Sequence, residues 1–158
     1  MGKILPIVLH PAPSLREISK PVPLADLANK EMKELIEDMK ATMMALDGAG
    51  LAAPQIGKNI RLIVINNERS KEIITLVNPV ITKKSWGRKV DQEGCLSVLD
   101  AKGDFIYGPV SRHKKVNCIY YDELGQKKKI EGDWLISRII QHEVDHLDGI
   151  LFIDKLEK

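Results

Sequence analysis

A short motif near the C-terminus, Gln141-His142-Glu143-Val144-Asp145-His146, constrains the fold more than any other feature of the chain. Residues four apart on a helix share one face, so His142 and His146 would point the same way. Two such imidazoles bind one divalent metal, and Glu143 beside them can accept a proton from metal-bound water. The segment therefore predicts a metal-binding helix that needs a further ligand from elsewhere. Its apolar positions predict that the helix is packed inside the protein: Ile139, Ile140, Val144 and Leu147.

Length and composition favour one soluble domain, residues 1–158, with a substantial core. The formal net charge of +2 gives no reason to expect direct nucleic-acid binding. No apolar run reaches the length of a membrane span, and the N-terminus lacks a signal-peptide pattern. The two cysteines do not suggest a disulfide framework, so we expect a reducing, cytoplasmic compartment.

Hydrophobic periodicity predicts one helix over 24–46, with Asp26 as its N-cap, and a second over 134–147, with Asp133 as its N-cap. Residues 3–9 are expected to form a strand or an extended arm, and residues 100–109 a loop. Short strands are predicted at 61–66 and 73–82, the latter broken near Asn78-Pro79, and a hairpin at 115–121 and 126–131.

A stretch of small residues, 48–57, follows the first predicted helix and contains Gly48, Gly50 and Gln55. It matches a dinucleotide-binding pattern only superficially, because it follows a helix and Pro54 interrupts it. We interpret it as a segment whose small side chains leave the backbone accessible, so that another chain can approach closely. Gln55 has two interpretations, a partner for local backbone groups or a hydrogen-bond donor in a site.

Cys95 lies in a second informative stretch, Glu93-Gly94-Cys95-Leu96-Ser97. A free cysteine is usually a small buried apolar residue. A thiolate is also the ligand that two histidines lack, because one Cys with two His is an accepted catalytic zinc set. Cys118, among apolar strand residues, is expected in the core.

Together the stretches at 48–55, 93–97 and 141–149 resemble the three signature motifs of the peptide deformylase family, in order and spacing. The resemblance covers essentially the whole chain. It implies an α+β fold in which antiparallel β-sheets pack around a central C-terminal metal-binding helix, with an N-terminal helix. It also implies hydrolysis of the formyl group from the N-formylmethionine of newly synthesised polypeptides, releasing formate.

The same resemblance implies roles for individual residues. Cys95, His142 and His146 would bind one divalent metal ion, Fe²⁺ in the cell, for which zinc, nickel or cobalt can substitute. Glu143 would be the general base, while the Gln55 side chain and the Leu96 backbone N–H would stabilise the oxyanion. Gly50, with Gly48, would contact the extended substrate.

The implied partners are N-formylmethionyl nascent peptides at the ribosome, and the implied state is a monomer in the bacterial cytoplasm. This chain departs from the family pattern at several positions. Ala49 replaces a larger aliphatic residue and would widen the methionine pocket. Leu99 replaces a proline, the loop over 98–112 is longer, with Lys102 as its basic residue, and the chain stops at Lys158 without an extended C-terminal helix.

Two other hypotheses keep a metal at this site. A zinc endopeptidase also uses H-E-x-x-H, but it takes its further ligand from His or Glu and does not need Cys95. A metal-stabilised binding module would need the ligands but not Glu143.

Overall fold

The computed structural model describes residues 2–158, which form two α-helices, seven strands and four short 3-10 helices. The α-helices are α1 (Lys30–Ala45) and α2 (Trp134–Leu147). The strands are β1 (Gly50–Ala52), β2 (Leu62–Asn67), β3 (Glu72–Lys84), β4 (Arg88–Glu93), β5 (Gly108–His113), β6 (Lys115–Tyr121) and β7 (Lys127–Asp133). The 3-10 helices are Pro13–Arg16, Leu24–Ala28, Ala53–Ile56 and Phe152–Lys155.

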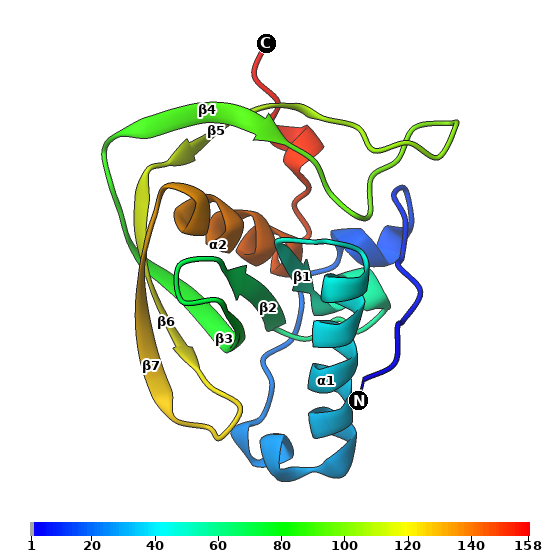
Figure 1. Ribbon diagram of the computed structural model, residues 1–158, viewed down its shortest axis with the longest axis vertical. Coiled ribbons are helices and arrows are strands. Elements are labelled where there is room, and N and C mark those ends of the chain that lie inside the picture. Colours follow the sequence, from blue (N-terminus) through cyan, green and yellow to red (C-terminus); the bar gives the residue numbers. More distant parts are fainter. Residues whose placement is uncertain (1) are drawn as a thin grey trace.

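The central element is α2, which lies between two antiparallel sheets (Figure 1). The larger sheet has the strand order β1-β2-β3-β6-β7, and the smaller sheet pairs β4 with β5. The prediction of an α+β fold with sheets around a C-terminal helix is therefore confirmed. Neither helix among the described residues has the length and apolar character that crossing a membrane requires.

Strand β2 is buried on both faces because α1 and α2 pack on opposite sides of it. Side chains alternate along a strand, so Leu62 and Val64 join the cluster with α1, while Ile63 and Ile65 join the cluster with α2. This is why the strand reads as an uninterrupted apolar run. The same packing fixes the position of α2. The face of α2 that does not pack on the large sheet can therefore hold functional side chains in a defined geometry.

The predicted helix over 24–46 is wrong in its first turns. Leu24–Ala28 is a 3-10 helix, and α1 begins only at Lys30. Asn29 separates the two because its backbone is extended (φ −72°, ψ 142°), so Asn29, and not Asp26, is the N-cap of α1. The helix predicted over 134–147 is observed with those bounds, and Asp133 is its N-cap residue, although the Asp133 side chain makes no capping hydrogen bond.

Strand β3 runs through Asn78-Pro79 without the predicted break. The register shifts between Val77 and Val80, which indicates a bulge that accommodates the missing N–H of Pro79. Asn78 has a positive φ of 51°, and its side-chain amide pairs with both backbone groups of Val22, at 2.8 and 2.9 Å.

The small sheet was not predicted. Strand β4 exposes five of its six positions, so it lacks an apolar alternation, and β5 begins at Gly108, inside the segment predicted as a loop. The N-terminal residues 3–9 run as an extended arm outside any strand; the Val8 N–H donates to the Gln55 carbonyl at 2.7 Å.

Candidate metal centre and active site

Both histidines of the motif lie on one face of α2. Their ring centroids are 5.0 Å apart, as expected for residues separated by one helical turn. His146 is buried, and the His142 side chain is 11% exposed. His142 therefore lines a pocket, whereas the adjacent His146 lies in the interior.

Cys95 joins this pair from the turn that follows β4. Its Sγ lies 3.3 Å from His146 Nε2, and the possible ligand atoms of Cys95, His142 and His146 all lie within 4.8 Å of one another. Cys118 lies in the core between the large sheet and α2, where burial raises the pKa of its thiol to about 11. Of the two interpretations of Cys95, the geometry favours the site.

The three donors fit a transition metal. One soft sulfur and two imidazole nitrogens suit zinc, iron, nickel or cobalt, and three protein ligands leave a position for water. His142 Nδ1 is 2.8 Å from Glu93 Oε1, so its Nε2 remains for a metal. His146 turns Nε2 toward Cys95 Sγ, while its Nδ1 is buried without a hydrogen-bond partner among the described residues.

Glu93 is the carboxylate that contacts His142, a role that no sequence pattern predicts for it. Burial alone would raise the pKa of Glu93, but hydrogen bonds from His142 and Arg112 hold that pKa well below its usual range. Two arginines, Arg112 and Arg138, contact it at 2.6–3.0 Å. The spacing of Arg138, four residues before His142, was the only signal for its place in this network.

Glu143 lies between the ligands and strand β1. It is buried, burial raises the pKa of its carboxyl to about 7, and its Oε2 has no hydrogen-bond partner among the described residues. A general base works best when its pKa is near the working pH. The carboxyl group is thus available for proton transfer to a molecule bound in the pocket.

Strand β1 is an open edge of the large sheet beside Glu143. The Ala49 carbonyl accepts a hydrogen bond from the Asn66 N–H, and Gly50 pairs with Ile65 in the next register position. Antiparallel pairs alternate between bonded and non-bonded, so the N–H and C=O of Gly50 point away from β2, toward the open edge. An extended peptide can add there as a further strand.

Gln55 points its amide nitrogen into the site. Its Oε1 accepts from the Ala52 N–H at 2.9 Å, which fixes the amide so that Nε2 approaches Ser97 Oγ at 3.1 Å and Cys95 Sγ at 3.5 Å. Both interpretations of Gln55 therefore have structural support. The Leu96 N–H makes no hydrogen bond within the described residues and remains available as a donor.

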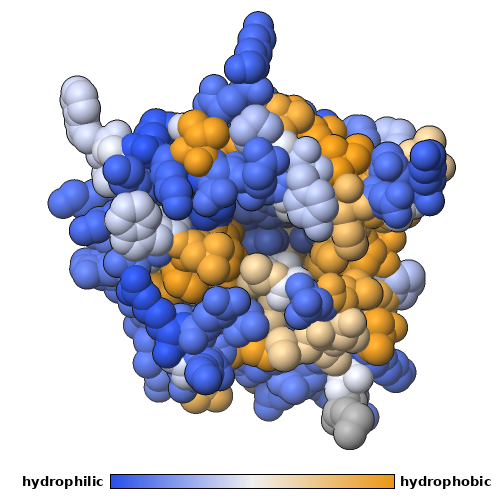
Figure 2. All heavy atoms as spheres, turned by 45° about the horizontal axis from the view of Figure 1, so that its top comes forward, coloured by the Kyte–Doolittle hydropathy of each residue, from blue (hydrophilic) through white to orange (hydrophobic). Residues whose placement is uncertain are grey.

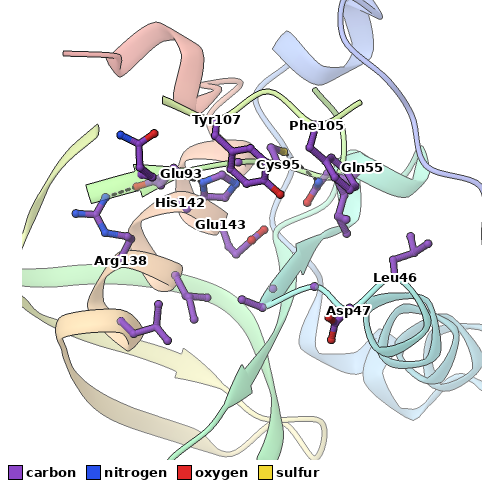
Figure 3. A pocket seen from close by; sticks show the side chains of 18 residues that line it. Leu46, Asp47, Gln55, Glu93, Cys95, Phe105, Tyr107, Arg138, His142 and Glu143 are labelled. Atoms are coloured by element: carbon purple, nitrogen blue, oxygen red, sulfur yellow. Dashed lines mark hydrogen bonds and ion pairs between the residues drawn. The ribbon is translucent and has the colours of Figure 1, made fainter. Parts of the chain in front are cut away.

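One pocket brings most of these groups together, and Figure 3 shows Glu93, Cys95, His142, Glu143 and Gln55 around it. Gly48, Gly50, Leu96 and Arg138 also line this pocket, whereas His146 and Arg112 do not. Figure 2 shows a hollow with a polar floor and apolar side chains along its border. Phe105 and Tyr107, from the long segment before β5, form part of this rim with their rings 6.5 Å apart. Neither aromatic residue was singled out from the sequence, while Lys102 does not line the pocket.

A sequence model described as "Polypeptide deformylase" matches residues 4–158. The chain belongs to the polypeptide deformylase family. A peptide deformylase from Wolinella succinogenes is 38% identical over 97% of this chain and 88% of its own length. One from Dehalococcoides mccartyi (strain CBDB1) is 42% identical over 93% of this chain and 83% of its own length.

Solved structures of the same family have the same fold. The actinonin-bound class I type b peptide deformylase of Acinetobacter baumannii superposes with a TM-score of 0.89 at 32% identity, covering 99% of this chain and 100% of that one. The Thermotoga maritima peptide deformylase gives 0.87 at 32% identity over 98% and 99%. The predicted family and enzyme class are confirmed, and the metal, the formate release and the residue roles remain predictions.

Gly50 of this deformylase site has no room for a side chain. A Cβ there would lie 2.7 Å from Glu143 Oε1 and 2.8 Å from Glu143 Cγ. Gly50→Ala is therefore expected to displace the carboxylate and lower kcat/KM for deformylation by about 100-fold. Gly87→Ala is the matched control, since its Cβ would meet only the flexible Lys114 side chain. Steady-state kinetics of both variants test this, and equal activities would contradict it.

Proposed function

We propose that this protein hydrolyses the formyl group from N-formylmethionyl peptides, with one divalent metal ion held by Cys95, His142 and His146. The observation that carries the proposal is the convergence of sulfur and imidazole donors, from segments 47 residues apart in the sequence, beside a buried carboxyl group. Ferrous iron is the proposed metal in the cell, with zinc, nickel or cobalt as substitutes. Bound there, the metal would lower the pKa of a coordinated water and polarise the formyl oxygen.

The side chains supply the remaining chemistry. Glu143 accepts a proton as water attacks the formyl carbon, and its raised pKa suits that task near neutral pH. Negative charge develops on the formyl oxygen, where the Gln55 amide and the Leu96 N–H donate hydrogen bonds. When the C–N bond breaks, Glu143 returns the proton to the amine, and formate and a free N-terminus are released.

The peptide binds along the open edge of β1, where the N–H and C=O of Gly50 pair with its backbone. Gly48 keeps the approach clear, since a Cβ there would lie 3.2 Å from Leu96 Cδ1. The methionine side chain enters the pocket next to Leu135 and Ile139 of α2, opposite the small Ala49. A related A. baumannii deformylase was solved with Met-Ala-Ser bound, which supports a peptide of this kind.

The setting of this reaction is part of the proposal. Residues 1–158 act as one catalytic domain and as a monomer. The substrates are nascent chains at the ribosome, reached in the bacterial cytoplasm. The bacterial origin of the similar deformylases supports this setting.

The decisive experiment uses anaerobically purified protein and a formyl-Met tripeptide. We expect stoichiometric formate, one free amine per turnover and about one metal ion per chain by mass spectrometry. Protein that carries the metal but releases no formate from such peptides would overturn the proposal.

Cys95→Ser separates deformylation from the endopeptidase alternative. A serine hydroxyl stays protonated and is a poor ligand for a soft metal, so we expect metal content and formate release to fall close to zero. Cys118→Ser, at the other cysteine, should keep the metal, because Cys118 lies in the core. A Cys95→Ser protein with full metal content and activity would favour the endopeptidase.

A further inference from the structure

Arg138 is a largely buried cation on α2, one helical turn before the proposed metal ligand His142. Its side chain is 11% exposed, and a charge so placed is costly unless its hydrogen bonds are made. We propose that Arg138 is a positioning residue for the metal centre, which holds Glu93 against His142 and thereby fixes the imidazole in its metal-binding orientation. This inference rests on the proposed metal ligands, but it goes beyond the motifs that identify the family.

The guanidinium of Arg138 reaches three groups in the small sheet. Nη1 donates to Glu93 Oε2 at 2.6 Å and to the Val110 carbonyl at 2.9 Å, while Nη2 donates to the Lys89 carbonyl at 2.7 Å. Lys89 and Glu93 belong to β4 and Val110 to β5. One side chain therefore ties α2 to both strands that lie over it, as Figure 3 shows for Glu93.

The two oxygens of Glu93 have different partners. Oε1 lies 2.8 Å from His142 Nδ1 and accepts from Arg112 Nη2 at 3.0 Å. Oε2 accepts from Arg112 Nε at 2.9 Å and from Arg138. Because two donors hold Oε2, the carboxylate is hindered from rotating away from His142. A histidine that donates Nδ1–H to a carboxylate keeps its Nε2 lone pair for the metal.

The two arginines are not equivalent. Arg112 comes from β5 and also pairs with Asp145, so it is anchored without Arg138. Arg138 comes from the same helix as the ligand that it positions, so His142, Glu93 and Arg138 close a ring of contacts within one turn of α2. Any movement of β4 relative to α2 must first break this ring.

Arg138 could affect metal binding through its charge or through the orientation of His142, and the two effects change metal affinity in opposite directions when Arg138 is replaced. A cation near the metal repels it, so removing the charge alone would tighten metal binding. Loss of an orienting partner of a ligand typically weakens metal binding by about 10- to 100-fold. The sign of the change therefore tells the two roles apart.

The test measures metal dissociation from the nickel- or zinc-loaded protein into excess chelator. Arg138→Met removes the charge and the three contacts, while Arg138→Lys keeps the charge but lacks the branched donor. We expect both variants to release metal about tenfold faster than the unmodified protein. An unchanged or slower release in the variants would overturn the inference.

A double-mutant cycle shows whether Arg138 acts through Glu93. In a Glu93→Gln background, Arg138→Met should cause little further acceleration, because the group that it positions is already altered. The full tenfold effect in that background would overturn the inference, since Arg138 would then act without Glu93. The cycle compares release rates and needs no assay of activity.

Arg88→Met is the matched control within the same sheet. Arg88 donates to Ser111 Oγ at 2.9 Å and to the Ser111 carbonyl at 2.8 Å, and it does not contact Glu93. This variant should lower the melting temperature without changing metal release; equal acceleration would mean that any loosening of the sheet suffices, and would overturn the inference. Unmodified protein that binds no metal would instead overturn the proposed function.

Discussion

Glu143→Gln is expected to lower kcat for deformylation by about 1,000-fold while the metal content stays unchanged. Glutamine has nearly the same shape as glutamate but cannot accept the proton of the attacking water. The metal should remain because its proposed ligands are Cys95, His142 and His146. Formate release and metal analysis of the same preparation provide the measurement.

Two comparisons make this result specific. Glu131→Gln removes an exposed carboxylate on β7 and should leave kcat unchanged. Asp145, the next acid on α2, already pairs with Arg112 and Lys155, so it is not free to replace Glu143 as a base. Activity of Glu143→Gln within about tenfold of the unmodified protein would contradict the assignment of the general base and would favour the binding-module alternative.

The parts of the fold that could be predicted from the sequence are those with a strong periodic pattern. The second helix was predicted over about 134–147, close to its observed bounds, because its apolar residues recur at helical spacing. Strand β2 was recognisable as a continuous apolar run. Strand β4 was not, because five of its six side chains are exposed, so its sequence has no alternation of apolar and polar residues.

The residues of the site likewise include some that the sequence predicts and some that it does not. The proposed ligands and Glu143 could be read from their spacing, because one helix or one motif carries the information. The contacts of Arg112 and Arg138 with Glu93 join positions 19 and 45 residues apart, and no local pattern encodes such pairings. The place of Phe105 and Tyr107 at the rim depends on the path of a long segment between β4 and β5, which sequence patterns do not specify.

Gln55→Glu is expected to lower kcat by about 100- to 1,000-fold with a much smaller change in KM. A carboxylate at this position can still accept the Ala52 N–H, so the turn around Gln55 should persist. It has lost the amide N–H groups that would donate to the formyl oxygen as negative charge develops there. The interaction strengthens only in the transition state, which is why kcat should change more than KM.

Ser97→Ala is the control for this variant, because it removes the hydroxyl group next to Gln55 Nε2 and leaves the amide in place. Its kcat should stay within about tenfold of that of the unmodified protein. If Gln55→Glu retained a similar kcat, the amide would serve only the local backbone through Ala52. The Leu96 N–H would then be the only protein donor of the two proposed here, and stabilisation of the oxyanion would rest mainly on the metal.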